Sequence, residues 1–169
     1  PLIDQVALDF GMPVGPVELA DVVGLDVCSH VGNIVAAEMG RAPPDLSRLK
    51  ELVAAGKLGR KSGEGFYRWI DGKARKPAAS GVAAPADLSD RLILALLNES
   101  AACLREGVVE DADLLDAGIV FGTGFAPFRG GPLNYARERG VAAVVSRMRE
   151  LALRHGSRFQ PDAGWDRLA

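Results

Sequence analysis

The sequence is poor in the residues that build metal sites, disulfide frameworks and nucleic-acid interfaces. Two cysteines and two histidines occur among 169 residues, and aromatic side chains make up 6% of the chain. The formal net charge of −2 supplies no basic surface for nucleic acid or an anionic membrane. Neither His30 nor His155 has a second histidine or a cysteine at ligand spacing, so we expect no metal site.

Long apolar segments are also missing. No run approaches the roughly 18 apolar residues of a membrane span, and residues 1–4 show neither the basic nor the apolar region of a signal peptide. Cys28 and Cys103 both fall in apolar helical patterns, where a free cysteine acts as a small hydrophobic residue. These features predict a reduced, cytoplasmic protein without a membrane span.

The common nucleotide and nucleophile motifs are incomplete. A phosphate-binding loop fails because Arg60 stands between Gly59 and Lys61. A dinucleotide fingerprint fails because Arg68 and Pro127 occupy the places of the third glycine. No Gly-x-Ser-x-Gly elbow is present. We therefore predict no catalytic, cofactor-binding or metal-binding residue within this chain.

What the sequence does have is a series of apolar helical patterns, most of them closed by glycine, which is a frequent helix stop. Residues 65–69 alone favour a short extended segment. In the segment 25–39, four apolar residues share one helical face: Val27, Val31, Ile34 and Val35. The predicted helices cover residues 3–10, 16–23, 25–39, 45–55, 89–106, 111–121 and 141–155.

Two halves of the chain resemble each other. Phe10-Gly11 and Gly15-Pro16 stand in the first half, and Phe121-Gly122 and Gly131-Pro132 stand in the second. Residues 71–88 between them lack an apolar period and are predicted to be a linker. The domain prediction is therefore a first repeat over 1–70, the linker, and a second repeat over 89–169.

The repeat also predicts an N-terminal truncation. In the second copy the helix over 89–106 precedes the helix over 111–121, whereas nothing precedes the helix over 3–10. We therefore expect a corresponding helix upstream of residue 1. Without it, an apolar groove should open near residues 3–10.

The segment Met12-Pro13-Val14-Gly15-Pro16 is the most informative part of the first copy. Gly15 suits an N-cap, Pro16 suits the first helical position, and Glu18 complements the positive end of a helix. These properties alone favour a structural role, a helix start, over a ligand site.

Longer motifs carry a resemblance to a known family. The residues concerned are Phe10–Asp26, Leu58–Tyr67, Leu97–Gly107 and Phe121–Pro132. They resemble the C-terminal region of 3-hydroxyacyl-CoA dehydrogenases, in the tandem form found in the α-subunits of multifunctional fatty-acid β-oxidation complexes. The resemblance implies an all-α fold of two pseudo-symmetric helical repeats, similar to the C-terminal domain of 6-phosphogluconate dehydrogenase.

The resemblance also implies an activity and its division between domains. Such enzymes use NAD, bound by an upstream Rossmann domain, to oxidise L-3-hydroxyacyl-CoA, and their catalytic His, Glu, Ser and Asn have no counterparts here. This chain is then expected to complete the acyl-CoA cleft and to be inactive alone. By the same resemblance, the substrate is lined by Pro13, Val14, Gly15 and Pro16.

The implied partners are an acyl-CoA substrate, upstream Rossmann and enoyl-CoA hydratase domains, a thiolase subunit, and a second copy of the chain. The alternative that the residues leave open is a non-catalytic helical module for dimerisation or assembly. A Gly-x-Gly-x-x-Gly strand-turn-helix upstream of Pro1 would favour the enzyme.

Overall fold

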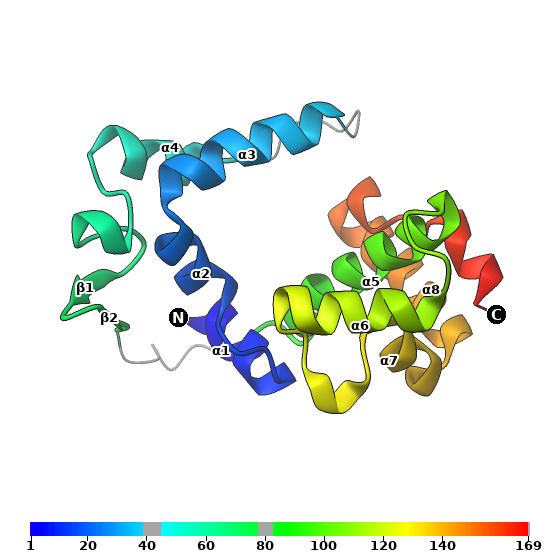
Figure 1. Ribbon diagram of the computed structural model, residues 1–169. Helices are drawn as coiled ribbons and strands as arrows, with labels where there is room; N and C mark the ends of the chain where they lie inside the picture. The colour runs from blue at the N-terminus through cyan, green and yellow to red at the C-terminus, as the bar shows by residue number, and fades with distance from the viewer. Residues whose placement is uncertain (39–44, 78–82, 169) are drawn as a thin grey trace. The chain divides into compact units, whose positions relative to one another are not determined.

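The chain folds into two compact, mainly helical units. The computed structural model describes residues 1–38, 45–77 and 83–168 (Figure 1). The first unit contains residues 1–5 and 14–83, and the second contains residues 6–13 and 84–169. Residues 6–13 group with the second unit because Phe10 packs edge-on against Phe125, 5.5 Å between ring centroids. The units therefore differ from the predicted repeats, which divide the chain only within the linker.

The first unit consists of short helices and one hairpin. Pro16 starts α2 at the first helical position, as predicted, and a bend of 104° separates α2 from α3. The end predicted for the helix over 25–39, at Gly40, lies outside the described residues. The elements are α1 (Leu2–Phe10, shared with the second unit), α2 (Pro16–Val23), α3 (Leu25–Glu38), α4 (Ser47–Ala54), the 3-10 helix η1 (Arg60–Ser62), β1 (Arg68–Ile70) and β2 (Lys73–Arg75).

A β-hairpin occupies the start of the predicted linker. β1 pairs antiparallel with β2, with Arg68 opposite Arg75 and Ile70 opposite Lys73 (Figure 1). The turn is Asp71-Gly72, with φ of 51° and 73°. Two central residues with positive φ suit a tight hairpin turn, for which Asp-Gly is a strong signal. Part of the linker prediction is thus replaced by an ordered hairpin, and the chain is mostly rather than wholly helical.

The core of the first unit is small. Leu25, Leu49 and Leu52 are buried together, and Leu46 and Val53 pack against this cluster. The apolar stripe of α3 behaves differently. Its four residues, Val27, Val31, Ile34 and Val35, are 42–48% exposed. α3 therefore carries an uncovered apolar stripe. In the region where a groove was expected, Ala7 and Phe10 are buried and Ile3 is 40% exposed.

No single helix within the described ranges is long and apolar enough to cross a membrane. The bent pair of α2 and α3 would qualify only on length and composition.

The second unit is built around the long helix α5. Its contacts are with α6, α7, α8 and the 3-10 helices near the C-terminus. The elements are α5 (Leu88–Glu106), α6 (Ala112–Thr123), η2 (Pro127–Arg129), α7 (Pro132–Arg139), α8 (Val141–His155), η3 (Ser157–Phe159) and η4 (Ala163–Arg167).

Large apolar side chains that are fully inaccessible form the centre of this unit. The apolar faces of α5 and α8 both line it, in agreement with the helices predicted over 89–106 and 141–155. Burying each such side chain contributes roughly 1.5–3 kcal/mol. They include Leu94, Leu97, Phe125, Val144, Met148 and Leu151.

The end of α6 differs from the sequence prediction, and the start of α5 lacks a side-chain cap. α6 continues past Gly122 to Thr123 and ends where the Gly124 N–H bonds the Val120 oxygen. Asp87 stands at the N-cap of α5, but its side chain makes no capping bond. It contacts His155 Nε2 at 2.8 Å instead, and that hydrogen bond lowers the pKa of Asp87.

Candidate functional site

The four residues predicted to line a substrate are consecutive between α1 and α2. Val14, Gly15 and Pro16 belong to the first unit, and Pro13 belongs to the second. Val14 is half-buried, Gly15 is buried, and Pro13 and Pro16 are exposed. The segment therefore presents two rigid prolines to solvent, with the glycine turned inward.

A buried carboxylate lies directly beneath this segment. Asp4 is completely inaccessible, and its Oδ1 accepts the Val17 N–H at 2.7 Å while its Oδ2 accepts the Glu18 N–H at 3.1 Å. These amides are among the first of α2, which have no partner within the helix. A carboxylate at a helix N-terminus also complements the helix dipole. Asp4 therefore fixes the start of α2 and, with it, the preceding turn.

Gly15 is required for this close approach. A Cβ built on Gly15 would overlap the Asp4 side chain. Gly15 supplies no side-chain cap of its own, so Asp4 takes that role from the neighbouring helix. The helix-start interpretation of the segment is therefore supported, and Asp4 is the group that makes it rigid.

The Asp4 carboxylate also receives donors from the C-terminal part of the first unit. The Tyr67 hydroxyl donates to Oδ2 at 2.8 Å. Lys76 Nζ lies 3.8 Å from the same oxygen and 2.6 Å from Glu18 Oε2. Burial raises the pKa of Tyr67, and the hydrogen bond to Asp4 raises it further. The hydroxyl is therefore protonated at neutral pH and acts as a donor.

A second buried carboxylate explains the glycine-rich segment before β1. Asp21 accepts the Phe66 and Tyr67 N–H groups, both at 2.8 Å, and the Trp69 indole N–H at 3.0 Å. A Cβ on Gly65 would overlap the Asp21 carboxylate. The glycines thus allow close packing against α2 rather than a phosphate cradle.

The second unit repeats the carboxylate beneath a Gly-Pro helix start. Asp116 of α6 accepts the Leu133 N–H at 2.7 Å and the Asn134 N–H at 2.8 Å, directly after Gly131-Pro132. Burial raises the pKa of Asp116, against the effect of these two bonds. The sequence repeat therefore reflects a repeated device, an aspartate on one helix that caps the next helix.

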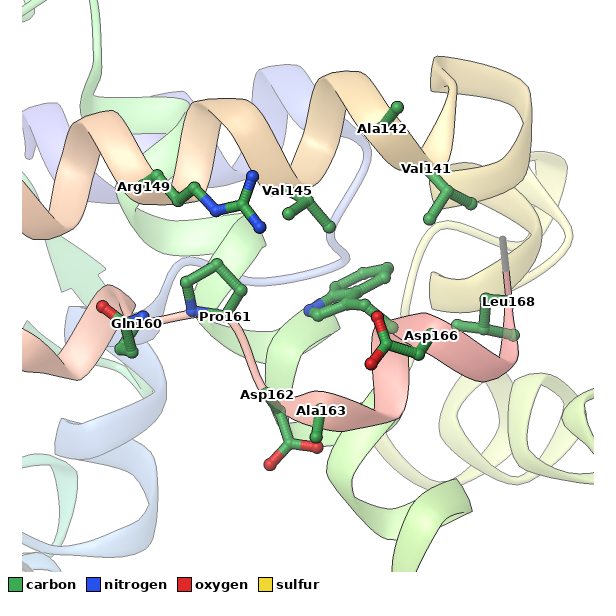
Figure 2. A pocket seen from close by; sticks show the side chains of 11 residues that line it. Val141, Ala142, Val145, Arg149, Gln160, Pro161, Asp162, Ala163, Asp166 and Leu168 are labelled. Atoms are coloured by element: carbon green, nitrogen blue, oxygen red, sulfur yellow. The ribbon is translucent and has the colours of Figure 1, made fainter.

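The second unit also contains a pocket of about 690 Å³ between α8 and the C-terminal 3-10 helices. Val145 and Arg149 project from α8, and Pro161 and Asp166 from the opposite wall (Figure 2). The buried Trp165 also lines it. Its charged lining residues are Arg149, Asp162 and Asp166, and no His, Cys, Ser, Thr, Lys or Tyr among the described residues lines it.

The described residues do not form a catalytic constellation. Asp4 and Asp21 each accept three hydrogen bonds from the chain itself, so both carboxylates are used in holding the fold. No group of three metal-binding side chains occurs among them. A Rossmann-type NAD site needs a parallel sheet, and the sheet in these ranges is the antiparallel hairpin.

Sequence reasoning missed Asp4, Asp21 and Tyr67. Asp4 and Asp21 could not be found from local sequence patterns, because their hydrogen bonds to Tyr67 join residues that are 63 and 46 positions apart in the chain. One signal was available. An aspartate on the helix before each Gly-Pro step, Asp4 and Asp116, belongs to the same repeat.

Similarity to known proteins covers nearly the whole chain. Residues 2–69 match the family described as 3-hydroxyacyl-CoA dehydrogenase, C-terminal domain. The fatty acid oxidation complex subunit alpha of Vibrio vulnificus is 36% identical over 171 residues, covering 96% of this chain and 24% of that protein. The subunit of the same name from Idiomarina loihiensis is 32% identical over 170 residues, covering 94% and 24%. The chain thus spans about a quarter of the length of these relatives.

Solved structures share the fold at low sequence identity. 3-Hydroxybutyryl-CoA dehydrogenase from Escherichia coli K12 superposes with a TM-score of 0.78 at 19% identity, covering 98% of this chain and 53% of that one. The dehydrogenase part of multifunctional enzyme 1 from C. elegans gives 0.63 at 17% identity, covering 99% and 41%. The predicted helical fold of the dehydrogenase C-terminal type is confirmed.

Proposed function

Because the chain carries a 3-hydroxyacyl-CoA dehydrogenase C-terminal domain and is homologous to fatty acid oxidation complex α-subunits, we propose that it completes the acyl-CoA cleft of an NAD-dependent L-3-hydroxyacyl-CoA dehydrogenase. The longer enzyme would oxidise the C3 hydroxyl of its substrate to a ketone. NAD and the proton-accepting residues would lie upstream of residue 1. This chain would supply the helical core and one wall of the substrate cleft.

The observation that carries this proposal is the rigid segment from Pro13 to Pro16. Within the first unit, the exposed Pro16 follows the buried Gly15, and Asp4 holds both from beneath, which makes a surface with little conformational freedom. A preformed surface binds a ligand without an ordering cost. In this enzyme the segment would contact the acyl-CoA, as the family resemblance implies.

A second function, subunit assembly, is favoured by the exposed apolar stripe of α3. Surfaces of this kind often mark protein contacts. The relatives are named as subunits of a complex, so we propose that the longer protein also contains a hydratase domain and binds a thiolase subunit or a second copy. Cys28 and Cys103 are free thiols, which accords with a cytoplasmic location.

The division of labour predicts a difference between the isolated chain and the longer protein. Residues 1–169 alone should neither bind NAD stoichiometrically nor oxidise 3-hydroxyacyl-CoA, because the part of the chain that the structure describes has no parallel sheet for a nucleotide. The longer protein should do both. Isothermal calorimetry with NAD and a spectrophotometric NADH assay on the two proteins measure this. Tight NAD binding by the isolated chain would contradict the assignment.

A further inference from the structure

We propose that the Tyr67 hydroxyl is a positioning group for the substrate-lining segment 14–16, acting through Asp4. The inference rests on the proposed function, which assigns that segment to acyl-CoA binding. The hydroxyl donates to Asp4 Oδ2 at 2.8 Å. The same carboxylate accepts the Val17 and Glu18 amides, the first donors after Gly15-Pro16. One oxygen thus joins the tyrosine to the start of α2.

Tyr67 is itself fixed at both ends. Its backbone N–H donates to Asp21 Oδ2 at 2.8 Å, and the residue is 4% exposed. Asp4 lies on α1 and Asp21 on α2. The tyrosine therefore connects two buried carboxylates on two helices, and the segment 14–16 contains the end of the connection between those helices and the first residue of α2.

Removing the hydroxyl would leave a looser set of donors on Asp4 Oδ2. The Glu18 amide is 3.1 Å away and Lys76 Nζ is 3.8 Å away, both longer than the tyrosine bond. Lys76 also binds Glu18 at 2.6 Å, so its charge is shared. The carboxylate could then rotate, and the amides that it fixes would move with it.

The second unit shows that capping alone does not require a tyrosine. Within the described residues, Asp116 receives only the Leu133 and Asn134 amides, yet it holds its own Gly-Pro helix start. The first unit adds Tyr67 and Lys76 to the same arrangement. The additional donors occur in the copy that carries the proposed substrate segment, which points to positioning rather than to helix formation.

The test compares Tyr67→Phe with Tyr135→Phe in the longer dehydrogenase. These are the two tyrosines of the chain, and Tyr135 lies half-buried in the second unit. Tyr67→Phe should raise KM for 3-hydroxyacyl-CoA by about tenfold and leave kcat within about twofold, because a displaced binding surface weakens substrate and transition state alike. KM for NAD should not change. Tyr135→Phe should leave all three constants unchanged.

Melting temperatures and a third variant, Val14→Trp, separate the outcomes. If Tyr67→Phe lowers the melting temperature but leaves KM unchanged, Tyr67 is only structural and the inference is overturned. If Val14→Trp raises KM in that same experiment, the proposed function is still supported although the inference about Tyr67 is not. If Tyr67→Phe leaves KM unchanged and Val14→Trp leaves both KM and kcat unchanged, the inference and the proposed function both fail. If KM rises with Tyr67→Phe but not with Val14→Trp, the tyrosine does not act through the segment 14–16, and the inference is also overturned.

Discussion

Replacing Phe125 by alanine is expected to destabilise the second unit by about 3–5 kcal/mol. The ring is fully buried and packs edge-on against Phe10. Its removal loses both the transfer free energy of the ring and the contacts of its neighbours around the cavity. Because whole domains are stable by only about 5–15 kcal/mol, the variant should lose most of its stability. Urea unfolding followed by circular dichroism measures the change.

Phe121→Ala is the matched control for this prediction. Phe121 is 88% exposed on α6, four residues before Phe125. Its replacement should change the free energy of unfolding by no more than about 0.5 kcal/mol. Equal effects from the two phenylalanines would mean that the core of the second unit is wrongly described.

Gly131→Ala is expected to cost about 2–5 kcal/mol, from strain and overlap together. The backbone φ is 112°, a region that residues with a Cβ rarely adopt. A Cβ there would also overlap the Asp116 carboxylate. The variant must therefore move Asp116 away from the Leu133 and Asn134 amides that it caps. Thermal unfolding should show a clear fall in the melting temperature.

Gly122→Ala provides the opposite expectation within the same unit. Gly122 lies inside α6, and a Cβ there meets no atom within 4 Å. Alanine should stabilise this helix by about 0.5–1 kcal/mol, because it restricts the unfolded chain. A fall in the melting temperature with Gly122→Ala would indicate that α6 ends earlier, as the sequence alone suggested.

Local patterns were sufficient to predict most helices. The stripe containing Leu97 on α5 and the one containing Met148 on α8 each match one face of a helix, and both side chains are fully buried. Glycine stops were less reliable, because Gly122 lies within α6 and Gly124 follows its end. A glycine can end a helix or be tolerated inside it, and the packing of the residues after it determines which of the two occurs.

Periodicity does not reveal what covers an apolar face. Val31 and Ile34 share a regular stripe on α3 but are each 48% exposed, whereas Leu25 at the start of the same helix is buried. The candidate site could likewise be predicted only in part, because local patterns do not show which distant residues contact it. Gly15-Pro16 was visible in the sequence, but the carboxylate and hydroxyl that hold it come from Asp4 and Tyr67, one on each side of it in the chain.

Two-substrate kinetics of Val14→Trp in the longer dehydrogenase test the central claim, that this chain lines the acyl-CoA cleft. Val14 is half-buried beside Gly15, so a larger side chain there should project into the space above the segment. We expect KM for 3-hydroxyacyl-CoA to rise, or kcat to fall, by about tenfold or more, with KM for NAD and the melting temperature unchanged. Unchanged kinetics with both substrates would contradict the account and reduce the segment to a helix start.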